Sequence, residues 1–456
     1  MCFDLIWKPG LIPSLTLFIF LRSNVYIWLT RILMNFRLKD FIFHNPLLIM
    51  LNLFAIGFYA FIIYDFGALS FIKNNLYLTS DSLEYLGYSK WLSGESDYCD
   101  AARTYFYPLL LMIANGLFGL IGPWIMQLLF WIIGCNLVYL SISKLTGRPF
   151  LSVISFLIVS TNISVIVYST HALTETTVFF FLGCLSYLLA IGIGKFNKGY
   201  LFFSITFLLT LLVVTKPLYG YLWFLYLLMI LIFHFRNLLK KPLLILLFLL
   251  ASIPFIGQMA INKSHLGTFS NNVIANYNYK TYFFRKVKYF AETNPHNNFD
   301  KLPDSVHASM IKKIEPIGDS EIRTFIFSNP IAVGEVIWDN LNQNLNSGNP
   351  YIPLKYHETM CKWVSFSATI LFYFHLLMTG LWIYFLWNRF KERRASIYLF
   401  IFFIGVMTYF ILYTSAISFW AGDRLISPAI VLWSGLYPLL IFQSLNRKIP
   451  LQQLKV

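Results

Sequence analysis

Ionisable side chains stand beside long apolar runs in this sequence, and their types could support chemistry. Asp81 and Glu84 lie in the string DSLEYLGYSKWLSGESDY, and Glu175 stands at the start of a later apolar run. A carboxylate in a partly desolvated site can take a proton from an attacking nucleophile. Read as a helix, the string places Asp81, Glu84, Tyr85 and Tyr88 on one face. The structural alternative is that Asp81 is the N-cap of a surface helix and Glu84 completes a capping box.

Three basic residues, Arg103, Lys216 and Arg424, could stabilise a phosphate. Arginine grips a phosphate through two parallel hydrogen bonds and lysine offers a point charge, so Arg103 and Arg424 are the better candidates. In the alternative interpretation, Arg103 and Lys216 are interfacial anchors that reach lipid headgroups, and Asp423 and Arg424 neutralise each other.

Glu175 and His171 also have structural alternatives. Glu175 could cap the start of its helix together with Thr174. His171 has no H-x-x-H or H-x-E spacing, so we interpret it as an interfacial histidine that supports the site and not as a metal ligand. The five cysteines form no CxxC pair, so no zinc or redox motif is predicted.

Long apolar runs must position these side chains. Hydrophobic residues make up 58% of the 456-residue chain and charged residues 12%, against roughly 25% charged in a soluble protein. A run of about 20 apolar residues matches the ~30 Å hydrocarbon core of a bilayer. The sequence therefore predicts an all-α polytopic membrane protein with about ten (nine to twelve) transmembrane helices, at residues 46–69, 124–143, 150–168, 173–191, 200–218, 219–235, 243–261, 364–387, 397–419 and 426–443.

Basic residues in the short loops set the predicted orientation. If the apolar stretch 106–122 does not cross the membrane, fourteen short-loop Lys and Arg residues lie on the cytoplasmic side and two, Lys216 and Arg424, lie outside. We therefore expect residues 107–122, opened by Pro108, to form a juxtamembrane or re-entrant helix on the outer side. The fourteen are Lys144, Arg148, Lys195, Lys198, Arg236, Lys240, Lys241, Arg389, Lys391, Arg393, Arg394, Arg447, Lys448 and Lys455.

This orientation divides the chain into four parts. Residues 1–45 form a cytoplasmic or interfacial segment, in which the role of 11–33 stays open, and residues 46–261 form a catalytic membrane module that includes an outer loop at 70–123. Residues 262–362 are long for a structureless connection, so we expect a mixed soluble outer cap with helical patches at 280–292 and 321–345. Residues 363–456 hold the last helices and a cytoplasmic tail. All the candidate site residues then lie on the outer face, which predicts a polar site there.

With the topology set, several strings in order resemble the GT-C glycosyltransferases, the superfamily of protein O-mannosyltransferases and aminoarabinose transferases. The first outer loop reads D-S-x-x-Y-x-x-x-S-x-x-L-x-G-x-x-x-Y over residues 81–98 and is followed by YPLLLMIANGLFG, the G-R pair at 147–148 and YSTHALTETTVFFFLG. TKPLYGYL and AGDRLISPAIV match two later segments of that family. Lys216 stands where the family usually has Arg, and Leu425 where it usually has Tyr.

The resemblance implies transfer of a monosaccharide from a polyprenyl-phosphate sugar donor to an acceptor glycan or glycolipid. It implies Asp81 as general base, Glu84 and Glu175 as acidic partners, and Arg103, Lys216 and Arg424 as phosphate-binding residues. Tyr85, His171 and Asp423 are supporting residues. It also implies a bacterial inner membrane location with the site facing the periplasm. Some relatives hold a divalent metal ion beside the catalytic acid, so a metal at Glu84 or Glu175 is an open alternative, although we predict none.

The sequence leaves two alternative functions for a polytopic membrane protein of this kind. An O-antigen polymerase or ligase usually has catalytic Arg and His residues in its large loop, whereas here the acidic residue lies in the first loop. A transporter or flippase often shows repeated halves and helices broken near the membrane midplane, whereas these charges lie at outer helix ends. The +15 net charge is mostly the cytoplasmic excess, so no nucleic-acid partner is predicted.

Two smaller features complete the sequence-based predictions. Cys99 and Cys361 are the cysteines that this orientation places outside, where they could be bridged or be unrelated thiols. The basic and aromatic run at 282–290 is interpreted as an amphipathic helix on anionic lipid.

Overall fold

The computed structural model describes most of the chain between residues 45 and 346 and a few residues beyond. The described ranges are 45–65, 79–97, 103–192, 199–231, 240–270, 279–292, 318–346 and 362–367, with the single or paired positions 309, 369–370, 373, 377, 427, 430–431 and 434–435. Within these ranges all regular secondary structure is helical. This confirms the all-α fold class.

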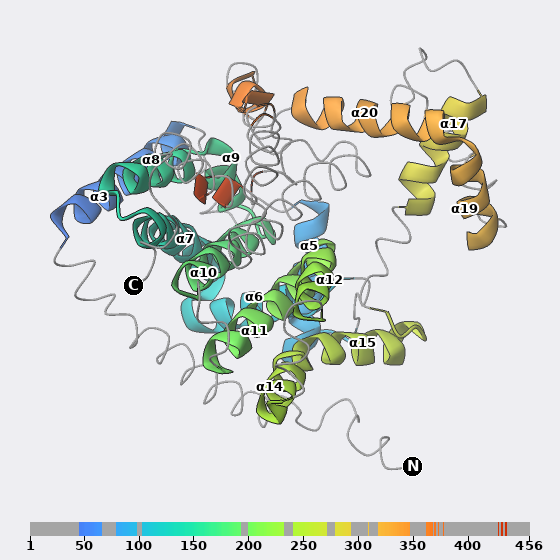
Figure 1. Cartoon of the computed structure of the whole chain (residues 1–456), viewed down its shortest axis with the longest axis horizontal. Coiled ribbons are helices and arrows are strands. Elements are labelled where there is room, and N and C mark those ends of the chain that lie inside the picture. The colour runs from blue at the N-terminus through green and yellow to red at the C-terminus, as the bar shows by residue number, and fades with distance from the viewer. Residues whose placement is uncertain are drawn as a thin grey trace.

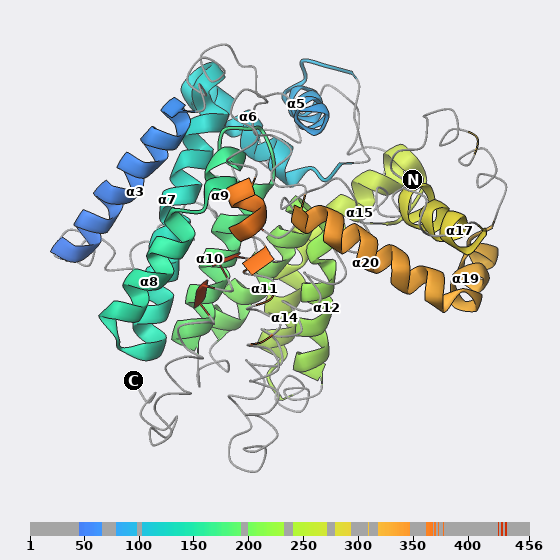
Figure 2. The same cartoon turned by 90° about the horizontal axis from the view of Figure 1, so that it is seen from above.

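Helices of the membrane module run along one another and form a bundle (Figures 1 and 2). The first is α3 (Pro46–Asp65), and the next long helix of the bundle is α7 (Gly122–Thr146). α8 (Pro149–Ser160), α9 (Ile163–Tyr168), α10 (Glu175–Gly192), α11 (Gly199–Thr215) and α12 (Gly220–Met229) continue the bundle, and α14 (Pro242–Ala251) and α15 (Ile253–Leu266) complete it.

Length and composition identify the membrane-spanning segments. Among the described residues, three segments are long and apolar enough to cross a membrane: Pro46–Tyr64, Phe106–Thr146 and Glu175–Gly192. The pair α14 and α15, bent by 45°, would be a fourth if it forms one span. The prediction of a polytopic membrane protein is thus confirmed, while the predicted number of about ten spans stays a prediction.

The stretch predicted to be a juxtamembrane helix forms α6 (Phe106–Phe118). With α7 it makes a helical segment of 41 residues, which at 1.5 Å per residue is about twice the thickness of the hydrocarbon core. A short 3₁₀ turn (Gly119–Ile121) separates the two helices. Gly119 adopts φ 64°, a conformation that residues with a Cβ rarely take, so the glycine allows the chain to turn there. Figure 2 shows α6 crossing one end of the bundle beside α5 (Ser80–Ser93).

Two of the predicted spans are not single straight helices, and single residues account for both interruptions. The expected span at 150–168 divides into α8 and α9 because the side chain of Asn162 accepts a hydrogen bond from Val165 N (3.0 Å) and starts a new helix. The expected span at 243–261 bends at Ser252, where Pro254 has no N–H to continue the ladder. The predicted turn near Pro217 is present, since α11 ends at Thr215.

Close contacts fix the directions of the helices in the bundle. A Cβ on Gly134 of α7 would meet the Phe179 ring of α10, and Gln127, two turns earlier in α7, donates a hydrogen bond to the His171 carbonyl just before α10. The two helices therefore run in the same direction. α3 joins α7 through two hydrogen bonds between the side-chain amides of Asn52 and Asn136 (2.9 and 2.7 Å). The starts of α7 and α10 thus lie at the same end of the bundle.

The described part of the expected cap forms a second helical unit with its own core. It contains a π-helical turn (Tyr279–Phe284) and three helices, α17 (Arg285–Glu292), α19 (Asp319–Ser328) and α20 (Pro330–Asn346). Val287 of α17 packs with Val336 of α20, and Phe325 of α19 packs against the same cluster. The expected helices at 280–292 and 321–345 are present, and the second is interrupted at Asn329, before Pro330.

The interpretation of the 282–290 run as a helix lying on lipid is wrong for two of its basic residues. Arg285 and Lys286 are buried. The Lys286 ammonium forms an ion pair with Asp339 (2.7 Å) and donates a hydrogen bond to Asn340 Oδ1 (2.8 Å), both in α20. The Lys286 side chain therefore holds α17 and α20 together.

Candidate functional site

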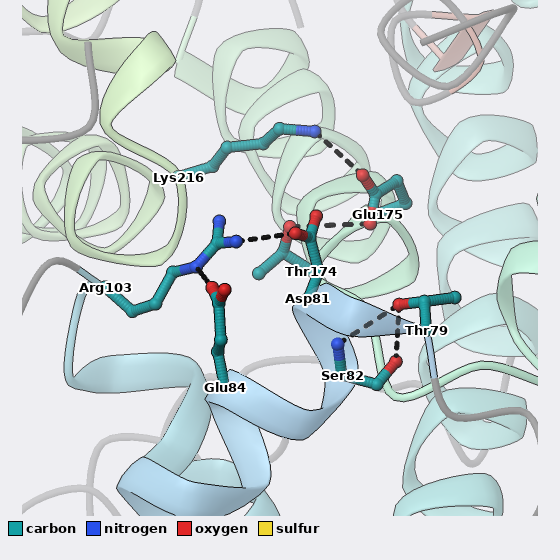
Figure 3. A network of polar contacts seen from close by, with 8 residues as sticks. All are labelled: Thr79, Asp81, Ser82, Glu84, Arg103, Thr174, Glu175 and Lys216. Atoms are coloured by element: carbon teal, nitrogen blue, oxygen red, sulfur yellow. Dashed lines mark hydrogen bonds and ion pairs between the residues drawn. The ribbon is translucent and has the colours of Figure 1, made fainter. Parts of the chain in front are cut away.

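Asp81 and Glu84 project from the first turns of α5. This helix begins after Thr79, whose side-chain oxygen accepts a hydrogen bond from Ser82 N (3.1 Å). Thr79 is therefore the N-cap, and the alternative in which Asp81 caps the helix is wrong. The two carboxylates are left to interact with Arg103, toward which both point in Figure 3.

Arg103 is shared between the two carboxylates. Its Nη2 donates to Asp81 Oδ1 at 2.5 Å, and its Nε donates to Glu84 Oε2. The guanidinium carbon also lies 5.2 Å from the centre of the Tyr85 ring. Burial lowers the pKa of Arg103, but Tyr85 and the two carboxylates outweigh this and raise the pKa above its ordinary value. Arg103 is thus a permanently charged group fixed on three sides.

Glu175 and Lys216 form a third ion pair. Glu175 is the first residue of α10, and its Oε1 accepts a hydrogen bond from Lys216 Nζ at 3.0 Å. The Glu175 side chain is 1% exposed and that of Lys216 15%. A carboxylate buried to this extent needs a compensating charge, which Lys216 supplies, and the α10 N-terminus adds to it. Because Arg103 and Lys216 are both paired with carboxylates, their alternative as headgroup anchors does not describe this structure.

One hydrogen bond brings the backbones of the two cations together. Thr104, which follows Arg103, donates its hydroxyl to the carbonyl of Thr215, which precedes Lys216 (3.1 Å), and both threonines are buried. The ion pairs of Arg103 and of Lys216 therefore lie at the same end of the bundle. Figure 3 shows the side chains of Asp81, Arg103, Glu175 and Lys216 close to one another, from four different segments of the chain.

Tyr85 and His171, two of the predicted supporting residues, are both buried. Tyr85 packs edge-on against Tyr107 of α6 at 5.1 Å between ring centres. His171 is buried in the turn between α9 and α10, and its Nδ1 lies 2.9 Å from the Val167 carbonyl, so Nδ1 carries the hydrogen. Gln127 of α7 donates to the His171 carbonyl. His171 therefore fixes the turn that leads into Glu175.

The described residues also bear on the metal alternative. In the ranges that the structure covers, no group of three or more His, Cys, Asp and Glu side chains is placed to hold a metal ion. Glu84 and Glu175 are each bonded to a basic side chain. Metal dependence stays to be tested by experiment.

Other predicted residues lie outside the described part of the chain. These are Asp423, Arg424, Cys99 and Cys361, and the roles predicted for them stay predictions.

Sequence reasoning missed three residues that shape the site: Thr104, Tyr107 and Gln258. Gln258 is fully buried in α15 and accepts a hydrogen bond from Tyr105 N at 2.8 Å. A glutamine within an apolar run is a costly residue, which is the signal that could have singled it out. No comparable signal marked Thr104, since threonine is common at loop ends.

The fold and the site together define an all-helical membrane protein with three ion pairs at one end of its bundle. No protein-family model and no curated protein matches the chain. Among solved structures, the chain is similar to ArnT from Cupriavidus metallidurans, crystallised bound to undecaprenyl phosphate. The sequence identity is 12%, the TM-score is 0.35, and the similarity covers 77% of this chain and 71% of that one.

Proposed function

We propose that this protein is a GT-C type glycosyltransferase that moves a monosaccharide from a polyprenyl-phosphate sugar to an acceptor glycan or glycolipid. The single observation that carries this proposal is the pairing of Asp81 and Glu84 with Arg103, beside the Glu175–Lys216 pair, at one end of a membrane bundle. Such a site combines a proton acceptor with cations for a departing phosphate, and the ordered strings that resemble the GT-C superfamily supply the same roles.

In the proposed reaction, an acceptor hydroxyl attacks the anomeric carbon of the donor sugar and its proton passes to the Asp81 carboxylate. The bond between that carbon and the phosphate oxygen breaks, and the polyprenyl phosphate leaves with an additional negative charge. Attack from the side opposite the phosphate inverts the anomeric carbon. Cations that face the phosphate stabilise the charge as it develops.

Arg103 is suited to link the base with the phosphate. Its Nε and Nη2 are held by Glu84 and Asp81, while Nη1 has no hydrogen-bond partner among the described residues and points away from both carboxylates in Figure 3. A phosphate oxygen bound at Nη1 would be held by the same rigid fork that positions Asp81. Lys216 and, from outside the described residues, Arg424 are the other proposed cations.

The proposed setting is a bacterial inner membrane with the site facing the periplasm. The donor is then a sugar on undecaprenyl phosphate, and the acceptor is a glycan such as O-antigen, a lipid A core or a cell-wall polymer. The fourteen cytoplasmic basic residues predicted from the short loops support this orientation.

A transfer assay with purified protein in liposomes, supplied with donor lipid and candidate acceptors, tests the proposal. We expect Asp81→Asn to remove transfer, since the amide keeps the shape but cannot take the proton, and Asp81→Glu to keep a trace. Glu84→Gln should retain far more activity, because its amide oxygen still accepts from Arg103. Transfer by Asp81→Asn at the wild-type rate would refute the assignment of Asp81, and flipping of donor lipid without transfer would favour a transporter.

A further inference from the structure

We propose that Thr104 and Gln258 are positioning residues that hold the Arg103 segment in the geometry required for transfer. This inference rests on the proposed function. Arg103, Thr104 and Tyr105 lie between α5 and α6, outside any helix, so the position of Arg103 depends on what its neighbours are bonded to. Neither positioning residue contacts Arg103 in an ion pair or hydrogen bond of its own.

Thr104 ties the segment to α11. Its hydroxyl donates to the Thr215 carbonyl at 3.1 Å, and that carbonyl ends the helix directly before Lys216. The last carbonyls of a helix have no partner within it, so the threonine satisfies an otherwise unpaired buried acceptor. Because Thr104 and Thr215 are direct neighbours of the two cations, this bond fixes the backbone separation between Arg103 and Lys216.

Gln258 ties the same segment to α15. Its Oε1 accepts from Tyr105 N at 2.8 Å, and its Nε2 donates to Asn262 Oδ1 at 2.8 Å. Asn262 in turn donates to the Ser270 carbonyl at 2.5 Å, so the chain of bonds reaches the start of the large outer loop. The Tyr105 hydroxyl adds a bond to the Pro254 carbonyl (3.3 Å).

The two tethers act on consecutive residues from two different helices, and the buried side chains that form them are shielded from water. The Arg103 side chain is bonded at its far end to Asp81 and Glu84. Its position is therefore set from both ends, by carboxylates at the guanidinium and by α11 and α15 at the backbone. Loss of either tether should displace the guanidinium from its productive position, and a displacement of about 1 Å can reduce an enzymatic rate by up to about a hundredfold.

The test uses the full-length protein and compares Thr104→Val with Thr210→Val. Thr210 is a buried threonine of α11 whose hydroxyl bonds only to its own helix, at the Thr206 carbonyl, so its valine variant is a matched control. We expect Thr104→Val to lower kcat/KM for the donor by about tenfold to a hundredfold. Thr104→Ser, which keeps the hydroxyl, should restore it, and Thr210→Val should behave like the wild type.

A positioning role through Arg103 is separated from general damage by a double-mutant cycle. In an Arg103→Lys background, the additional change Thr104→Val should have little further effect, since the fork that it positions is already absent. Equal losses for Thr104→Val and Thr210→Val, or a full loss in the Arg103→Lys background, would overturn the inference. If the wild type itself shows no transfer with any donor, that result refutes the proposed function. The positioning inference is then decided by the hydrogen-exchange measurement described next.

A second measurement does not depend on activity. Amide hydrogen exchange at Tyr105 should be slow in the wild type, and Gln258→Met, which removes the acceptor, should accelerate it at least tenfold while peptides from α10 stay protected. Gln258→Met should also lower kcat/KM for the donor, as expected for Thr104→Val. The inference can therefore be tested with Gln258→Met if Thr104→Val does not fold. Unchanged exchange at Tyr105 in Gln258→Met would show that this tether does not hold the segment.

Discussion

Replacement of Lys216 by methionine should destabilise the protein by leaving a buried carboxylate without its cation. Glu175 is 1% exposed, and its partner lies 3.0 Å away. Removal of one member of a buried ion pair costs about 3–5 kcal/mol. Because Lys216 keeps some contact with solvent, we expect the lower end of this range, about 3 kcal/mol. In a large domain this corresponds to a decrease in Tm of about 6 °C, at about 2 °C per kcal/mol.

The companion change Glu175→Gln distinguishes the ion pair from other effects of the lysine. When both residues are neutral, no charge is left buried, so the double variant should regain stability to within about 1 kcal/mol of the wild type. Transfer activity then separates two roles. If the ion pair is only structural, the double variant should regain transfer activity together with stability. If Lys216 contacts the donor phosphate, the double variant should be stable but transfer little sugar.

The assay is thermal unfolding of the detergent-purified protein at pH 7, followed by tryptophan fluorescence. Lys144→Met is a suitable control, since Lys144 is an exposed residue in the last turn of α7 and its loss should change stability by no more than about 0.5 kcal/mol. A Tm for Lys216→Met within 1 °C of the wild type would refute the reasoning, because Glu175 would then be compensated without Lys216.

Three further predictions test the fold, the orientation and the site. Gly122→Ala should cost about 1–3 kcal/mol in thermal unfolding, because its Cβ would lie 2.1 Å from the Ala114 backbone oxygen, whereas Gly116→Ala, with open space around it, should be neutral. In intact spheroplasts, Asn297→Cys should react with a membrane-impermeant thiol reagent and Lys391→Cys should not, and the reverse pattern would invert the predicted orientation. Arg424→Ala should lower the transfer rate a hundredfold or more, which corresponds to a loss of about 3 kcal/mol of transition-state stabilisation. A rate near that of the wild type would show that Arg424 does not bind the phosphate.

Much of the helical layout follows from the hydrophobic pattern. The runs that predict helices at 46–69, 124–143, 173–191 and 200–218 coincide with α3, α7, α10 and α11 within a few residues. The pattern cannot locate breaks inside an apolar run, because these depend on single polar or proline residues. Asn162 and Pro254 are such residues, and each interrupts a helix that hydropathy alone predicts to be continuous.

The sequence predicted which residues belong to the site, but not which of them form ion pairs with one another. Helical spacing predicted that Asp81 and Glu84 share a face, and both do contact one cation. Their pairing with Arg103, about twenty residues later, is set by how the chain returns between α5 and α6, which leaves no periodic signal. Sequence reasoning therefore gave Asp81 and Arg103 separate roles, whereas in the structure their side chains form an ion pair.

The charges at the site constrain how a phosphate could bind there. Asp81, Glu84 and Glu175 carry three negative charges and Arg103 and Lys216 two positive charges, so the described groups alone leave one excess negative charge. A phosphate added to this set is repelled unless a further cation approaches or a carboxylate takes up a proton. In the proposed reaction, proton transfer from the acceptor to Asp81 would neutralise a carboxylate at the moment when charge develops on the phosphate. Arg103, released in part from a neutralised Asp81, would then interact more strongly with the departing phosphate than with the bound donor, and such a difference is what accelerates the chemical step.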